Sequence, residues 1–331
     1  MNRLRSAAAI VICMSLALAP CAPAWGWNAA GHMAVALIAY RALPAAERDA
    51  WTALLKHHPH YELYLTPNRP EQVSEGEWAF LRASTWPDFV RPDKERTKPE
   101  EITQYHRGQW HYINLPYTPP EEVVRLGENH FRPAEVNVLV SLREVTSILK
   151  SSTATPKEKA IHLAWLLHLI GDIHQPLHCV ALVTRDYPQG DKGGNDLAVR
   201  DRNTNVTRLH AYWDDLPGTS GNYYNASLLV EALSADPQFS ADHFTAARER
   251  KLYPDWADEG YALAKEHVYL NGKLKTADFG AFEDGQVLRD QVPQVSEEYQ
   301  RQAHKLAKGR VMLAGLRLAD KLGEVFGVAR P

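Results

Sequence analysis

The sequence predicts a mainly α-helical protein in which residues 27–331 form a single domain. Apolar residues recur at helical spacing in several stretches, and neither an internal repeat nor a low-complexity linker divides the chain. With 331 residues, 45% of them hydrophobic, the chain can bury a sizeable core. We therefore expect helices joined by long loops, with at most one short β-hairpin.

Residues 1–26 have the pattern of a secretory signal peptide. Two arginines form the positive start, an apolar run too short for a transmembrane helix follows, and small residues end the segment. Cleavage after Ala24 and cleavage after Gly26 both fit this pattern. Lipidation of Cys21 is an alternative that the preceding proline disfavours. We expect export to the periplasm or out of the cell.

Loss of this leader changes the cysteine count and the charge. Cys13 and Cys21 leave with it, so Cys179 remains alone and the mature chain can form no internal disulfide. The formal net charge of −3 becomes about −5 when the two leader arginines are removed. This acidic balance argues against a broad basic surface for nucleic acid, although bound metal could supply positive charge instead.

The helical patterns follow the chain from its mature start to its end. The segment 157–174 is apolar on most sides, so we expect it at the centre, beginning near Pro156 and ended by Pro176. The segment 195–210 suggests the β-hairpin. The expected helices span 32–43, 134–150, 157–174 and 305–327. Loops rich in proline and glycine are expected at 87–99, 116–120 and 186–196, within a longer loop region over about 185–225.

Two histidine–aspartate pairs have the spacing of metal ligands on a helix. His168 and Asp172 are four residues apart in "HLIGD", and "HAYWD" repeats this with His210 and Asp214. Four residues turn a helix by about 400°, which places both side chains on one face, about 40° apart. Further candidates are His178 in "QPLH", His111 in "QWHYINLPY" and Asp88 in "STWPDFVR". Nitrogen and oxygen ligands without a thiolate suit zinc or another borderline divalent ion in a catalytic setting.

Each pair also has a plainer interpretation as a salt-linked helix surface. For His168 and Asp172 this interpretation is weaker, because their helix is almost entirely apolar and two buried polar side chains are costly unless something satisfies them. His32 alone is more typical of a histidine packed on a helix face. His174 is expected to be structural or to support the ligands. The remaining histidines are expected at the surface or in structural positions: His57, His58, His60, His106, His130, His162, His243, His267 and His304.

In chain order, "WNAAGH", "STWPD", "WHYIN", "HLIGDIHQPLH", "GGN" and "LHAYWD" resemble the secreted zinc-dependent single-strand nucleases and 3′-nucleotidases of the S1/P1 family. The resemblance covers nearly the whole mature chain and implies a mainly helical catalytic domain with three zinc ions. It implies that Trp27 binds zinc through its α-amine and carbonyl oxygen, which requires cleavage after Gly26 and an unlipidated Cys21. The implied ligand sets are Asp88, His111, His168 and Asp172; Trp27, His32 and Asp172; and His178, His210 and Asp214.

The resemblance also implies an activity and its substrates. Single-stranded DNA and RNA would be hydrolysed to 5′-phosphate products by a water bridging two zinc ions, with 3′-nucleotides as further substrates. Arg91 would stabilise the phosphoryl charge and Tyr112 would stack a base. The plainer alternatives are a surface arginine beside a loop and a core aromatic. Asn114 replaces an aspartate of fungal members. Asn195 is expected at the cleft rim or, alternatively, in a purely structural turn. We expect a monomer without an obligate protein partner or stable membrane association.

Two other functions are open at this point. Zinc-dependent phospholipases C share the implied fold and much of the ligand set, but they carry glutamate at the position of Asp214, and the five-residue spacing from Trp27 to His32 is that of the nucleases. A non-catalytic periplasmic zinc-binding protein is the second alternative. Product analysis separates the phospholipase, and any turnover excludes the non-catalytic protein.

Overall fold

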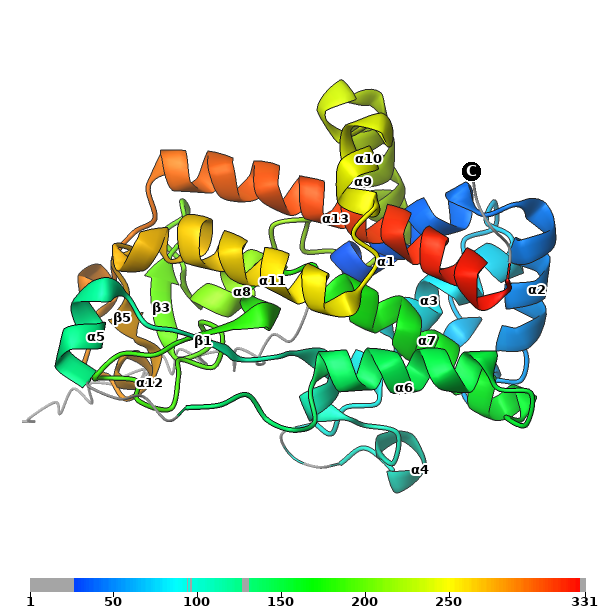
Figure 1. Ribbon diagram of the computed structural model, residues 1–331, viewed down its shortest axis with the longest axis horizontal. Coiled ribbons are helices and arrows are strands. Elements are labelled where there is room, and N and C mark those ends of the chain that lie inside the picture. The colour runs from blue at the N-terminus through cyan, green and yellow to red at the C-terminus, as the bar shows by residue number, and fades with distance from the viewer. Residues whose placement is uncertain (1–26, 94, 96, 127–130, 328–331) are drawn as a thin grey trace, which may run out of the picture.

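A computed structural model describes residues 27–93, 95, 97–126 and 131–327 and confirms the mainly helical class (Figure 1). The leader, with Cys13 and Cys21, and His130 lie outside these residues. Cys179 is a buried free thiol. Among the described residues, no helix is both long enough and apolar enough to span a membrane.

Helix α7 (Pro156–Asp172) is the central element, and α1 (Ala29–Ala42), α3 (Glu75–Phe89), α6 (Val138–Lys150) and α13 (Glu297–Val325) pack against it. Thr155 and Glu158 form a capping box at its start, where they satisfy backbone N–H groups that have no partner within the helix. Its last turns are buried on all sides, as its apolar sequence predicts.

Helix α13 lies across α1, and a glycine permits this crossing. A Cβ at Gly315 would come within 2.5 Å of the Ile38 side chain, so only glycine fits there. The remaining α-helices are α2 (Ala45–Leu55), α4 (Glu100–Thr103), α5 (Pro120–Leu126), α8 (Leu209–Asp214), α9 (Tyr223–Ala235), α10 (Thr245–Arg248), α11 (Tyr253–Leu263) and α12 (Phe279–Glu283). Short 3₁₀ and π turns are η1 (Tyr61–Leu65), η2 (Gly108–His111), η3 (Pro176–Cys179), η4 (Pro237–Phe239), η5 (Asp242–Phe244), η6 (Ala264–Val268), η7 (Leu270–Gly272) and η8 (Arg289–Gln291).

The described residues also form two small sheets, one of two strands and one of three. Strand β1 (Leu115–Tyr117) pairs in parallel with β2 (Val180–Leu182), and the antiparallel sheet has the order β4 (Val206–Arg208), β3 (Leu197–Arg200) and β5 (Ala277–Asp278). The pair β3–β4 is the hairpin that the sequence suggests. The parallel pair joins segments far apart in the chain, which local patterns do not show.

Several expected boundaries were wrong. The segment 87–99 is not all loop, because Pro87 and Asp88 still belong to the last turn of α3, where tertiary packing outweighs the missing proline N–H. Helix α7 ends at Asp172, four residues before Pro176. The region 185–225 is only partly loop, since it contains β3, β4 and α8. Helix α6 begins at Val138 instead of 134, because Asn137 caps its first turn. Helix α13 begins at Glu297 instead of 305, because Ser296 caps its first turn. Helix α1 begins at Ala29 instead of 32, after the Asn28 cap. The expected loop 116–120 overlaps the end of β1 and the start of α5.

Candidate metal centre

The eight predicted histidine and aspartate ligands form three contiguous groups around the end of α7. Within each group, one possible ligand atom per residue lies within 4.8 Å of the others. The groups are His32, His168 and Asp172 (the N-terminal group); Asp88, His111 and His168 (the middle group); and His178, His210 and Asp214 (the third group). They draw on α1, α3, η2, α7, η3 and α8. The fold thus unites residues spread over most of the mature chain.

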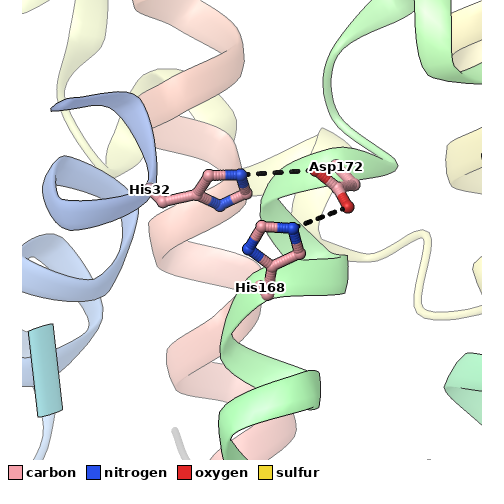
Figure 2. Close-up of side chains that lie close together, drawn as sticks. All are labelled: His32, His168 and Asp172. Atoms are coloured by element: carbon pink, nitrogen blue, oxygen red, sulfur yellow. Dashed lines mark ion pairs between the residues drawn. The ribbon is translucent and has the colours of Figure 1, made fainter. Parts of the chain in front are cut away.

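In the N-terminal group, two imidazoles meet the two oxygens of one carboxylate (Figure 2). His32 Nε2 lies 3.3 Å from Asp172 Oδ1, and His168 Nε2 lies 3.2 Å from Asp172 Oδ2. All three side chains are fully buried. Both His32 nitrogens and Asp172 Oδ1 have no hydrogen-bond partner among the described residues. Buried polar atoms without partners are costly, and a cation between them would satisfy them.

Gly171 makes this approach possible. A Cβ on this residue of α7 would lie 2.7 Å from His32 Nδ1 and 3.0 Å from His32 Cε1, both shorter than normal contacts. It would also lie 3.8 Å from Cδ1 of Trp27. Thus α7 can receive His32 from α1 only because the residue before Asp172 has no side chain. This glycine had no predicted role, although it lies within the motif "HLIGD".

Trp27 lies beside this group and is held there by its neighbour. Its side chain is fully buried, and its Nε1 has no partner among the described residues. Asn28 caps α1 through Oδ1, donates its backbone N–H to the Asp214 carbonyl oxygen at 3.3 Å, and donates Nδ2 to Asp215 Oδ1 at 2.7 Å. The backbone after Trp27 is therefore fixed between the N-terminal group and the end of α8.

The middle group shares His168 with the N-terminal group and also contacts Asp172 of that group. His111 Nδ1 lies 2.9 Å from Asp172 Oδ2 and 3.0 Å from His168 Nε2, which itself lies 3.8 Å from Asp88 Oδ1. His168 donates Nδ1–H to the Ser84 carbonyl oxygen at 2.7 Å, so its Nε2 is left free to face the carboxylates. Asp172 is therefore within reach of metal positions on both sides of it.

In the third group, two imidazole nitrogens face each other without a hydrogen between them. His178 donates Nδ1–H to the His111 carbonyl oxygen at 2.6 Å, and His210 donates Nδ1–H to the Gly193 carbonyl oxygen at 2.7 Å. Both Nε2 atoms therefore present lone pairs in the neutral rings, yet they are only 3.2 Å apart. A shared metal ion would turn this repulsive contact into two coordinate bonds.

Gln175 orients the carboxylate of this third group. Its Nε2 donates to Asp214 Oδ1 at 2.7 Å, and its Oε1 accepts from the Leu177 backbone N–H at 2.6 Å, which fixes the amide orientation. Asp214 Oδ2 is then left 3.5 Å from His210 Nε2, with no hydrogen-bond partner among the described residues. Gln175 had no predicted role, although it lies between Asp172 and His178 in the quoted motif "HLIGDIHQPLH"; its burial becomes visible only in the structure.

Burial and mutual repulsion keep two of the histidines, His32 and His210, in the neutral form that binds metal. Burial and the neighbouring His168 lower the pKa of His32 to about 4, and burial and His178 lower that of His210 to about 3. Burial also raises the pKa of the Asp214 carboxyl well above its ordinary value. Ionisation of the Asp214 carboxyl is therefore costly unless a cation lies beside it.

The opposite balance holds at the other carboxylate. Burial works to raise the pKa of Asp172, but the facing histidines, His168 first and then His178, outweigh it and lower the pKa well below its ordinary value. Burial works to lower the pKa of His168, but Asp172 and Asp88 outweigh it and raise the pKa to about 9. In the metal-free chain the two form a buried ion pair, whose positive partner a divalent cation can replace.

Three of the predicted substrate-binding residues line one cavity of about 190 Å³ next to the third group. They are Tyr112, Asn114 and Asn195, and the cavity also touches His178 and His210. Lys192 and Arg208 line it too, and the sequence analysis did not single them out. Arg208 donates Nη1 to the Asn195 carbonyl oxygen at 2.8 Å, so it helps to hold this rim.

Arg91 lies one turn beyond Asp88, at the end of α3. Its backbone N–H donates to the Asp88 carbonyl oxygen at 3.2 Å. Burial lowers the pKa of its guanidinium, while the nearby Asp88 carboxylate raises it. Its charge therefore sits partly desolvated beside the middle group. His106 lies in the same electrostatic neighbourhood, since burial first, and then His111 and Arg91, lower its pKa to about 4.

The other described histidines stand apart from the three groups. His58 and His60 are buried around Trp86, and His174 is buried against α13, where its Nε2 lies 3.0 Å from Arg317 Nη1. These positions are structural, as the sequence analysis expected.

Comparison with known proteins gives a consistent result. A family model described as "S1/P1 Nuclease" matches residues 27–327. "Endonuclease 5" of Arabidopsis thaliana is 28% identical over 257 residues, which cover 70% of this chain and 77% of the relative. "Endonuclease 4" of the same plant is 28% identical over 251 residues (69% and 75%), and "Endonuclease 3" is 26% identical over 322 residues (92% and 90%).

Proposed function

Because this chain belongs to the S1/P1 nuclease family, we propose that it is an exported trinuclear-zinc phosphodiesterase acting on single-stranded DNA and RNA. Family membership makes the chain a nuclease, and the mainly helical fold agrees with this. The single observation that carries the zinc proposal is the pair of His178 and His210 Nε2 atoms, 3.2 Å apart with their Nδ1 hydrogens committed elsewhere. The unpartnered buried oxygens of Asp172 and Asp214 support it.

Three zinc ions would be held by the residues already grouped. Asp88, His111, His168 and Asp172 would hold one, and His178, His210 and Asp214 another. Trp27, through its α-amine and carbonyl oxygen, would hold the third ion with His32 and Asp172. When bound, zinc supplies an activated water at neutral pH and neutralises the charge that develops on the phosphate oxygens.

The protein groups would orient and select the substrate. Arg91, partly desolvated beside Asp88, would pair with a phosphate oxygen. Tyr112 would stack an unpaired base in the cavity beside the third group, while the Asn114 amide could both donate to and accept from its edge. A base that must leave its stack to enter this cavity favours single strands. The same cavity would admit 3′-nucleotides as substrates.

Zinc ligation by a terminal amine fixes how the chain must be processed. Residues 1–26 would be removed after Gly26, without lipidation of Cys21, and the mature domain 27–331 would act as a monomer in the periplasm or outside the cell. Three zinc ions add six positive charges to a mature chain of about −5, so the centre attracts an anionic substrate although the protein is acidic.

Product analysis by mass spectrometry tests this proposal. The chain beginning at Trp27 is incubated with single-stranded DNA or RNA and zinc, with EDTA in a parallel sample. We expect nucleoside 5′-phosphates that disappear with EDTA, and none from Asp172→Asn. The matched control Asp320→Asn changes an aspartate on α13 that pairs with Arg248, and it should retain activity.

Other outcomes would redirect the proposal. Products with 3′-phosphate ends would contradict the proposed chemistry. Zinc bound without hydrolysis of either nucleic acid would reject the nuclease proposal. A subsequent assay with phosphatidylcholine would then separate a phospholipase C from a non-catalytic zinc-binding protein.

A further inference from the structure

A second cavity, of about 840 Å³, lies between α11, α13 and the short helices η4, η5 and α10. Helices α11 and α13 run along each other in Figure 1, with α10 above them. The cavity shares no lining residue with the three metal groups or with the cavity beside Tyr112. Its walls include Phe239, Phe244, Leu263, Leu306 and Leu313, so most of its side-chain surface is apolar. This size and lining are typical of a small-molecule site.

Arg310 lines this cavity and keeps an unused hydrogen-bond donor. Only 6% of the residue is exposed. Its Nε donates to the His174 carbonyl oxygen at 3.0 Å, and its Nη1 donates to Glu259 Oε2 at 3.0 Å. Its Nη2 is buried and has no partner among the described residues. A buried guanidinium donor without an acceptor is costly, so an acceptor supplied from the cavity would be favourable.

The groups that face Arg310 leave positive charge in excess. Glu259 is the carboxylate it contacts, and Arg317 contacts that same carboxylate at 2.7 Å, with Arg250 at 3.5 Å. The cavity wall and the ion pairs around Glu259 contain four positive side chains and three negative ones. The positive ones are Arg250, Lys305, Arg310 and Arg317, and the negative ones are Asp255, Asp258 and Glu259. One positive charge therefore remains for an anion to neutralise.

A glycine in the middle of α13 keeps the cavity open. Gly309 lies inside a 29-residue helix, where glycine is unfavourable compared with alanine. A Cβ there would have the rings of Phe239 and Phe244 as its nearest neighbours, both at 3.8 Å, which is ordinary contact. Packing therefore does not require this glycine, in contrast to Gly315. The space above Gly309 belongs to the cavity.

We propose that this cavity binds an organic anion with an apolar body, of the class of medium- and long-chain carboxylates. Three of the lining residues are buried: Phe239 and Leu313, which are apolar, and Arg310. A ligand with one anionic group and an apolar chain matches these three buried residues. The carboxylate would accept from the Arg310 guanidinium, and the chain would lie over Gly309 against Phe239 and Phe244.

Calorimetric titration of the mature chain with decanoate below its micelle concentration tests the proposal. Decanol, which has the same chain without the charge, is the matched ligand, and adenosine 5′-phosphate is an anion without an apolar chain. Gly309→Leu fills the cavity without touching Arg310. Glu298→Leu introduces the same residue at an exposed position of α13 outside the cavity.

We expect decanoate to bind at one site per chain and decanol at least tenfold more weakly. Gly309→Leu should weaken decanoate binding at least tenfold while zinc content and nuclease activity stay unchanged, and Glu298→Leu should bind as the unmodified chain does. No heat of binding with decanoate would overturn the proposal. It would equally fail if decanol bound as tightly, if adenosine 5′-phosphate competed for the site, or if Gly309→Leu bound normally.

Discussion

Gly171→Ala tests whether the close approach of α1 and α7 builds the N-terminal group. The added methyl group would lie 2.7 Å from His32 Nδ1 and 3.0 Å from His32 Cε1. His32 is fully buried, so the ring cannot turn into solvent to avoid the clash. It must instead move away from α7, and therefore away from Asp172.

The free energy of unfolding has two opposing contributions in this variant. Replacing glycine by alanine in a helix stabilises by up to about 1 kcal/mol. Forcing a methyl group into a filled site costs about 1–3 kcal/mol. The sum is a loss of about 0–3 kcal/mol. Gly309→Ala on α13 has the helix contribution without the clash, since its Cβ meets nothing closer than 3.8 Å, and it should gain up to about 1 kcal/mol.

Two assays separate stability from metal binding. Urea unfolding in EDTA measures the metal-free proteins, and zinc analysis after dialysis measures the ions retained per chain. We expect Gly171→Ala to be less stable than Gly309→Ala and to retain one zinc fewer. If Gly171→Ala kept the full zinc content and matched Gly309→Ala in stability, the clash with His32 would not govern this site and the reasoning would be refuted.

Three further predictions concern Gln175, Asn28 and His58. Gln175→Leu leaves the buried Asp214 Oδ1 without its donor, and we expect zinc affinity at the third group to fall by about 10–100-fold, measured by competition with a chelator. Asn28→Ala removes the cap of α1 and the hydrogen bond to Asp215. The free energy of unfolding in EDTA should fall by about 1 kcal/mol. Zinc analysis should show that the ion near Trp27 is lost. Burial and then His60 lower the pKa of His58 from 6.5 to about 3, so the unfolded chain takes up this proton first as pH falls. The contribution of the neutral His58 ring to the free energy of unfolding is complete above about pH 6.5. It falls by about 2 kcal/mol at pH 5 and continues to fall toward about pH 3. In urea unfolding at pH 8 and pH 5, His58→Asn should therefore show a smaller loss of stability than the unmodified chain.

Matched variants define what would contradict these predictions. Asn222→Ala removes the cap of α9 and should cost similar stability with zinc intact, so equal zinc loss in both cap variants would reject a specific role for Asn28. Unchanged chelator competition in Gln175→Leu would remove Gln175 from the site. A decline between pH 8 and 5 that is as steep in His58→Asn as in the unmodified chain would assign it to other groups.

Local patterns made the central helix and its ligand pairs predictable. The apolar run and the capping residues define α7, and the four-residue spacing of His168 and Asp172 places both on one face regardless of the rest of the fold. The sequence alone could not show that His32 and His111 reach the same carboxylate, because this depends on how α1 and η2 pack on α7. Resemblance to a family supplied the grouping that local geometry could not.

The missed features share one physical cause, which is that their role depends on contacts between distant segments. Gln175 is significant only because α8 brings Asp214 within 2.7 Å of it. Gly171 matters only because α1 places His32 against it. Asp88 was expected in a loop because Pro87 disfavours a helix interior, yet packing of α3 extends the helix through both residues.

The position of Asp172 shows why this fold and its metals are expected to depend on each other. The helix that carries it is buried almost throughout, which is a costly place for a carboxylate and for His168. The contacts that offset this cost in the described chain are with four histidines, and they leave Oδ1 without a hydrogen bond: His32, His111, His168 and His178. A cation on either side of this carboxylate would complete what the imidazoles begin. Metal binding would then contribute directly to the free energy of unfolding, because the unfolded chain cannot assemble side chains from α1, α3, η2 and α7 around one point.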